Sequence, residues 1–430
     1  MTHKPGDKVE IETTDGTFTG MIMPNENAST LFIKLSSGYN VGIEKKKIKQ
    51  IEVLEGFKDN KKESKIEVKE NKNLPTISIL HTGGTIASQV DYRTGAVVSR
   101  FSPEDLLKLV PEMIKIANIK TNLVFQMFSE DMEPSHHWSV LAEEIAKELK
   151  NNVKGIIVGI GTDTLEYVSS AMSFALQNLP VPVLIVGSQR STDRPSTDAA
   201  LNLLAAAHFI SKTDFAGVAV CMHDNENDDV CLVMEGNYVK KMHTSRRDTF
   251  RPINKKPIAK VNSSGNIEYL RKDYSKSDGK FVLQSKFSNK VGFVKIYPGF
   301  RAEELDYYEK NSDGLIIEGY AFGQMPINKL DEATAHHPKL LEKVKKIANK
   351  MPVVVVAQRP YGLTYMNVYS TGKDLLNAGV IEGKMLPHVA YAKLSWVLGR
   401  TNKLHEIKRE IQTNIVGEIL DRVEDKTFLI

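Results

Sequence analysis

The pattern of hydrophobic and polar positions divides the chain into three zones. Between residues 5 and 55, short apolar stretches alternate with turn residues such as Asp15-Gly16. Strands of four to six residues with turns at these intervals are typical of a small β-barrel. We therefore predict a barrel at residues 1–55, whose small core needs support from another surface. Its expected strands are 9–12, 18–23, 31–35, 41–43 and 48–53.

A charged stretch follows at residues 56–74 and contains almost no large apolar side chains. This composition predicts a linker. An exposed strand around residues 66–68 is the alternative interpretation.

From Pro75 onward, continuous apolar runs replace the short strands. Runs of this kind that alternate with helical stretches indicate βαβ units and a predominantly parallel sheet. We predict a first α/β domain at residues 75–288, with a polar, turn-rich part at 237–290. The expected strands are 77–80, 155–158, 183–186 and 218–220, and the expected helices are 138–149, 165–177 and 199–210.

A second set of apolar strands and helices indicates a smaller α/β domain at residues 289–430, which includes a tail from Thr401. The predicted fold class is therefore α/β, with two α/β domains after an N-terminal β-barrel. The expected strands are 291–296, 314–317 and 352–356, and the expected helices lie near 339–350, 373–378 and 389–398.

The overall charge and composition narrow the class of protein. The chain has 430 residues and a net charge of +4, which argues against a dedicated nucleic-acid binder. No apolar run approaches the roughly 18–20 residues of a membrane span, and the polar start argues against secretion. Two cysteines, Cys221 and Cys231, are too few for a disulfide framework, so we expect a reduced, cytoplasmic setting.

Two pairs of adjacent histidines are the only clusters that suggest a metal site. They are His136-His137 and His336-His337. Adjacent residues on a helix do not face the same ion, so we predict no metal site.

The run His81-Thr82-Gly83-Gly84 directly follows a predicted buried strand. Two glycines allow unusual backbone angles and a close approach to main-chain N–H groups. Ligands in open α/β folds bind at this carboxyl edge of the sheet, where Thr82 would present its hydroxyl. A plain turn between strand and helix is the alternative.

Two further groups of polar residues lie at predicted strand ends. Thr162 and Asp163 follow the strand at 155–158, and Ser129 and Glu130 follow a strand near 123–128. Either group could cap the next helix, which is the ordinary role of such residues. The functional interpretation is that they share a sheet edge with Thr82.

The segment 235–241, EGNYVKK, contains the lysine pair Lys240-Lys241. Most lysine pairs lie on solvated surface. A buried lysine beside Asp163 could instead help a threonine hydroxyl lose its proton, because an alcohol is a poor nucleophile until a neighbouring group activates it.

Taken together, these motifs resemble the asparaginase/glutaminase family. The resemblance covers about residues 76–402. The matching runs are TGGTIAS at 82–88, GTDT at 161–164, GSQR at 187–190, the lysine of EGNYVKK, and the later stretches 355–381 and 385–399.

The resemblance implies a two-domain amidohydrolase with a left-handed crossover that forms a covalent acyl-enzyme on a threonine. Thr82 corresponds to the nucleophile, and Thr162 and Asp163 to the family's GTD pair. Lys241, rather than Lys240, corresponds to the family lysine. Which threonine attacks first stays open.

The resemblance also suggests substrate-binding residues. Ser129 and Glu130 match the position that holds the amino-acid head group of the substrate. Tyr92 is the candidate lid tyrosine, on a polar segment whose composition suits a mobile loop.

The first 75 residues are not part of the usual family pattern. With this extension, the chain resembles glutamine-hydrolysing subunits of tRNA-dependent amidotransferases. The resemblance implies that ammonia from glutamine passes to a partner protein, which binds Glu-tRNA(Gln) and uses ATP and Mg²⁺. It also implies a homodimer within a heterotetramer, no membrane association, and no cofactor for the hydrolysis itself.

Two other functions remain open at this point. One is a stand-alone L-asparaginase with an N-terminal extension. The other is a non-catalytic binding protein that has kept the fold, against which the presence of all four catalytic residue types argues.

Overall fold

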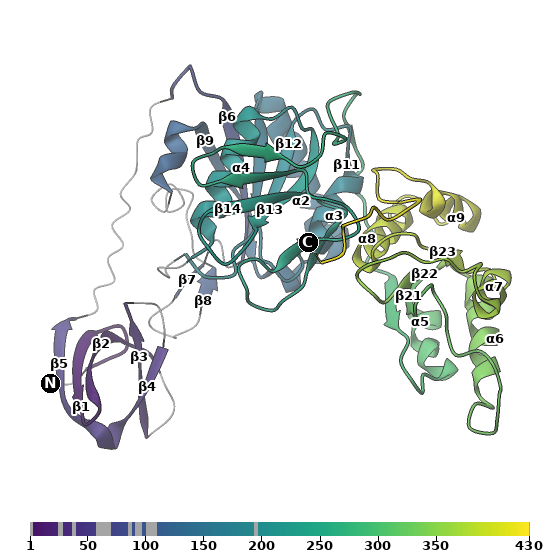
Figure 1. Ribbon diagram of the computed structural model, residues 1–430, viewed down its shortest axis with the longest axis horizontal. Helices are drawn as coiled ribbons and strands as arrows, with labels where there is room; N and C mark the ends of the chain where they lie inside the picture. Colours follow the sequence, from purple (N-terminus) through teal and green to yellow (C-terminus); the bar gives the residue numbers. More distant parts are fainter. Residues whose placement is uncertain are drawn as a thin grey trace.

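The computed structural model describes residues 3–24, 29–36, 40–56, 70–84, 110–192 and 197–429, and only the backbone of 88–90 and 97–99. Figure 1 shows a small β unit at the N-terminus, a central α/β body and a smaller α/β body at the C-terminal side. Among the described residues, no helix is long and apolar enough to cross a membrane.

The N-terminal unit contains the five expected strands in one antiparallel sheet, in the order β4-β3-β2-β1-β5. Alternate residues of β1 point into a small core that includes Val9, Ile11 and Ile33. The strands β4 and β5 lie at the two edges of this sheet. Among the described residues, no pairing between β4 and β5 closes the sheet into a barrel. Its strands are β1 (Lys8–Thr13), β2 (Gly16–Ile22), β3 (Thr30–Leu35), β4 (Asn40–Glu44) and β5 (Ile48–Glu55).

The central body is built on an eight-stranded sheet in the order β18-β17-β14-β13-β12-β10-β6-β9. The pairs from β9 to β13 are parallel, and those from β13 to β18 are antiparallel. The predominantly parallel α/β sheet is thus confirmed. Its strands are β6 (Thr76–Gly83), β9 (Asn118–Met127), β10 (Gly155–Gly159), β12 (Pro182–Val186), β13 (Gly217–His223), β14 (Val230–Glu235), β17 (Ala259–Asn262) and β18 (Ile267–Tyr269).

Helices cover both faces of this sheet. Ile156 and Val158 of β10 pack in the same apolar cluster as α2 (Ser139–Glu148) and α3 (Leu165–Ala175). Ile157 points to the opposite face and packs with α4 (Ala199–Lys212). Because both faces are covered, the strands are apolar throughout, which is why the sequence showed runs rather than alternation.

The turn-rich part at 237–290 holds several short strands that the sequence pattern did not reveal. Strands of two to four residues are too short to show a periodicity. Besides β17 and β18, they are β15 (Val239–Lys241), β16 (Phe250–Pro252) and β19 (Val282–Leu283).

The C-terminal body contains a parallel four-stranded sheet in the order β20-β21-β22-β23. A helix, α9, lies where we expected only a tail, and its apolar positions Ile407 and Ile411 are buried. The elements are β20 (Val291–Lys295), α5 (Asp306–Asn311), β21 (Gly314–Gly319), α6 (His337–Ala348), β22 (Val353–Ala357), α7 (Ser370–Asn377), β23 (Ile381–Glu382), α8 (Pro387–Leu398) and α9 (Leu404–Gln412).

Helix α8 joins the two α/β bodies. It packs along α3 of the central body, and residues from both belong to one apolar cluster. The rings of Phe174 on α3 and Trp396 on α8 stack with their centroids 5.6 Å apart. The two bodies therefore share a continuous hydrophobic core.

A buried ion pair holds the segment after α9 against α8. Lys393 on α8 contacts the carboxylate of Glu418, and both side chains are fully buried. Lys393 Nζ also donates to Ile411 O at 2.9 Å and to Thr413 O at 2.6 Å. Burial lowers the pKa of Lys393. The hydroxyl of Tyr238 donates to Gly417 O, so this segment also contacts the central body.

The buried histidines of the α/β bodies include His81 at the end of β6 and His388 on α8. Burial lowers the pKa of each to about 4. The unfolded chain, in contrast, takes up these protons below about pH 6.5. Their contribution to stability is therefore complete above about pH 6.5 and is lost as the pH falls towards 4.

We predict that His81 and His388 each contribute an acid destabilisation of about 2 kcal/mol between about pH 7.5 and pH 5. His81→Leu should reduce the acid-induced fall in the urea midpoint, because Leu has no proton to gain. The control is His405→Gln, since the His405 side chain is 79% exposed. An equal fall in the parent and in His81→Leu would contradict the prediction.

Candidate active site

The site lies where the parallel strands β6 and β10 end side by side, with His81 paired to Gly159. Gly83 and Gly84 adopt φ of +95° and +74°. A Cβ added to Gly84 would lie 2.3 Å from the Gly161 nitrogen. Glycine is therefore required here for the two strand-end loops to touch.

Three of the predicted residues form one hydrogen-bonded network. Lys241 Nζ donates to Thr162 Oγ1 at 2.9 Å and to Asp163 Oδ1 at 2.8 Å. Thr162 is buried and the Lys241 side chain is 13% exposed, whereas the Asp163 side chain is 67% exposed. The network therefore has a buried hydroxyl at one end and solvent at the other.

Thr82 lies beside this network without a recorded bond to Lys241. Its side chain is fully buried, and its Oγ1 donates to Gly159 O at 3.0 Å. Gly159 ends β10, three residues before Thr162. The structure thus brings both threonines to the same sheet edge, as we expected because each follows a predicted buried strand.

The capping interpretation of this loop is wrong. The residue before α3 is Thr164, and no side chain caps the helix. Thr164 Oγ1 instead donates to Ser129 O at 2.8 Å, which ties the loop to the next strand end. Neither Thr162 nor Asp163 bonds to the first turn of α3 among the recorded contacts.

Ser129 and Glu130 border the same edge, in a short 3₁₀ turn after β9. Ser129 is buried, and a Cβ on Gly161 would lie 2.8 Å from Ser129 Oγ. Glu130 is exposed, and one of its oxygens lies 3.4 Å from Ser129 Oγ. Tyr92 lies outside the described residues.

Two buried carboxylates that the sequence interpretation missed organise the surrounding loops. Asp198 accepts bonds from Ser188 Oγ and from the main chain of Gln189 and Arg190, which shapes the GSQR loop. Glu166, on the first turn of α3, accepts the Lys241 N–H at 2.6 Å. For Glu166, the available signal was an acidic residue within the mostly apolar helix α3.

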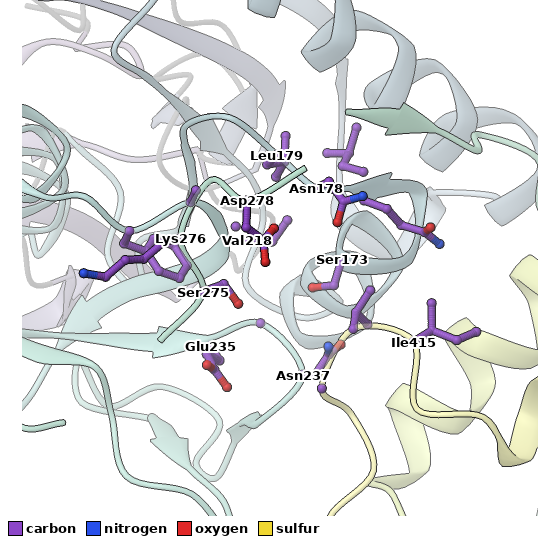
Figure 2. A pocket seen from close by; sticks show the side chains of 18 of the residues that line it. Ser173, Asn178, Leu179, Val218, Glu235, Asn237, Ser275, Lys276, Asp278 and Ile415 are labelled. Atoms are coloured by element: carbon purple, nitrogen blue, oxygen red, sulfur yellow. The ribbon is translucent and has the colours of Figure 1, made fainter. Parts of the chain in front are cut away.

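A separate hollow of about 430 Å³ lies at the opposite edge of the sheet (Figure 2). Its walls include Val218 near the start of β13, Leu176 directly after α3, and Ile415 after α9. The catalytic candidates are not among its lining residues. Within the part of the chain that the structure describes, no group of three or more His, Cys, Asp or Glu residues could hold a metal ion.

Family models match three consecutive parts of the chain. The GatD N-terminal domain matches residues 3–54. The N-terminal asparaginase domain matches residues 76–274. The glutaminase/asparaginase C-terminal domain matches residues 290–410.

Curated relatives extend over nearly the whole chain. The D subunit of glutamyl-tRNA(Gln) amidotransferase from Pyrococcus furiosus is 46% identical, over 99% of this chain and 94% of that protein. The corresponding D subunit from Thermococcus kodakarensis is 45% identical, over 99% and 96% respectively. The one from Methanobrevibacter smithii is 39% identical, over 99% and 96%.

Solved structures of asparaginases resemble the two α/β bodies. The thermostable L-asparaginase of Thermococcus kodakarensis aligns with a TM-score of 0.72 and 31% identity, over 81% of this chain and 100% of that one. L-asparaginase I of Vibrio cholerae aligns with a TM-score of 0.68 and 27% identity, over 81% and 99%.

We predict that Gly84→Ala separates the two strand-end loops and destabilises the protein. Its Cβ would collide with the Gly161 backbone, and overpacking of this kind costs about 1–3 kcal/mol beyond the strain of a positive φ. Gly299→Ala is the matched control, because Gly299 has φ of +90° and nothing within 4 Å of an added Cβ. Thermal melting measures both variants, and equal losses would contradict the role of the contact.

Proposed function

The chain belongs to the family of glutamyl-tRNA(Gln) amidotransferase D subunits, and from this membership we propose that it hydrolyses glutamine to supply ammonia for the conversion of Glu-tRNA(Gln) to Gln-tRNA(Gln). The observation that carries the hydrolytic role is the bonding of Lys241 Nζ to both Thr162 and Asp163, beside Thr82. A hydroxyl, a lysine and a carboxylate in contact form an activated-nucleophile arrangement.

In the proposed reaction, a threonine Oγ attacks the side-chain carbonyl carbon of glutamine and forms an ester. The hydroxyl proton passes through the Lys241 network to the leaving nitrogen, the C–N bond breaks, and ammonia departs. Water then attacks the ester, which releases glutamate and restores the hydroxyl. The order in which Thr82 and Thr162 act stays open, since both lie at the edge where the substrate would bind.

Main-chain N–H groups could stabilise the negative oxygen of the tetrahedral intermediate. The Gly84 N–H already donates to Met127 O at 3.2 Å. This favours the N–H groups around Thr162, which follow the end of β10. One such donor typically contributes about 3 kcal/mol to lowering the barrier.

Ser129 and Glu130 are the proposed contacts for the amino-acid part of glutamine. Ser129 lies against Gly161, one residue from Thr162, so a substrate held there would reach the hydroxyl network. We retain Tyr92 as the candidate lid residue on sequence grounds.

The amidation step needs a second protein. We propose that the E subunit, GatE, binds Glu-tRNA(Gln), uses ATP and Mg²⁺ to activate its glutamyl group, and receives the ammonia in the cytoplasm. Two copies of each protein would form the heterotetramer. The hydrolysis itself is proposed to need no cofactor.

We predict that Thr82→Ala, Thr162→Ala, Asp163→Ala and Lys241→Ala each lower kcat for glutamine hydrolysis by at least about a hundredfold without unfolding the chain, because each removes part of the activated nucleophile. Ammonia release measures the rate, and circular dichroism checks folding. Full activity in a folded Thr162→Ala variant would contradict the network.

A second assay tests the coupling to tRNA. Glutamine hydrolysis is measured with and without GatE and Glu-tRNA(Gln), and we expect stimulation when both are present. Rapid hydrolysis of free asparagine with no response to the partner would favour a stand-alone asparaginase instead.

A further inference from the structure

We propose that Glu166 is a positioning residue that selects Lys241, rather than its neighbour Lys240, for the catalytic network. The inference rests on the proposed function. It concerns a carboxylate that contacts neither Thr162 nor Asp163 in any recorded bond. Its contacts are all to the strand that carries the lysine pair and to the helix that covers it.

Both oxygens of Glu166 engage β15. Oε2 accepts the Lys241 main-chain N–H at 2.6 Å. Oε1 lies 3.3 Å from Lys240 Nζ. One carboxylate therefore fixes the backbone of one lysine and the ammonium group of the other.

The alternation of a β-strand explains how this contact separates the two lysines. Successive side chains on β15 point to opposite sides. Lys240 reaches Glu166, while Lys241 reaches Thr162 and Asp163. A slip of β15 by one residue would exchange the two ammonium groups, and Glu166 resists this slip by holding both neighbours.

Thr162 and Glu166 belong to the same short piece of chain, since α3 begins three residues after Thr162. The acceptor that fixes the Lys241 backbone is thus rigidly linked to the hydroxyl that its side chain must reach. The same helix also contacts the turn before β15, because Ser169 Oγ donates to Gly236 O at 2.9 Å. Contacts from helix α3 therefore fix the position of residues 236–241.

The second α/β body keeps the Glu166 contact away from water. The Glu166 side chain is only 9% exposed, and the fully buried His388 of α8 places Nδ1 3.8 Å from Oε1. The ring of Tyr167 packs edge-on against His388. A hydrogen bond to a charged group is stronger in such a low-dielectric setting.

The test compares Glu166→Gln and Glu166→Ala with the parent chain. Gln keeps an oxygen for the Lys241 N–H but cannot hold the Lys240 ammonium, whereas Ala loses both contacts. We expect kcat for glutamine hydrolysis to fall by about tenfold in Glu166→Gln and further in Glu166→Ala, with KM within about twofold of the parent.

A second substitution separates positioning from a general effect on packing. Lys240→Met removes the competing ammonium group. Added to Glu166→Gln, it should restore at least about threefold of the lost kcat, and added to Glu166→Ala it should restore little. The matched control is Glu148→Gln on α2, a buried carboxylate bonded to Asn122 and Asn151, which should leave kcat unchanged.

The inference is wrong if folded Glu166→Ala retains the parent kcat, if only KM changes, or if Lys240→Met fails to restore activity to Glu166→Gln. These outcomes can be distinguished from a failure of the proposed function. If the proposed function is wrong, the parent chain itself releases no ammonia from glutamine, and Thr162→Ala makes no difference.

Discussion

The contact between the ends of β6 and β10 is the constraint on which the rest of the site depends. Parallel pairing brings Thr82 and Thr162 to one edge, but only the absence of a side chain at Gly84 lets their loops meet. Ser129 then packs against Gly161 on the other side. The ends of β6, β9 and β10 thus form one surface. The distances between these three strand ends determine where the other side chains of the site can make contact.

The lysine reaches this surface from a distant part of the chain, and the helices make that possible. Helix α3 begins at the site, holds β15 by its first turn, and packs along α8 of the second body. The shared apolar core removes water from the ionic contacts around Glu166. The second α/β body therefore supports the position of Lys241, although none of its described residues is recorded in the Lys241 network.

Sequence patterns predicted the α/β class, the long buried strands and the candidate site residues that lie at strand ends. These features follow from long apolar runs and from the rule that ligands bind at the carboxyl edge.

The sequence patterns could not reveal the short strands between 237 and 290 or helix α9, which has only a narrow apolar stripe. The roles of Glu166 and Asp198 were also out of reach, because each depends on burial against residues far away in the chain. Glu166 meets Lys241 across 75 positions. Nor could the sequence show that Thr164 bonds to Ser129 rather than capping its own helix, since a tertiary contact replaced the local preference.

The buried pair of Lys393 and Glu418 has a consequence for the mobility of the segment after α9. Because the ammonium and the carboxylate are both fully buried, moving residues 413–418 away from α8 would separate two charges in an apolar setting, which is energetically costly. The hydroxyl of Tyr238, three residues from Lys241, donates to Gly417 O in the same segment. Release of the segment would therefore also remove a contact from the chain that leads into the lysine strand. The segment after α9 is thus a fixed connection between the two α/β bodies rather than a loose tail.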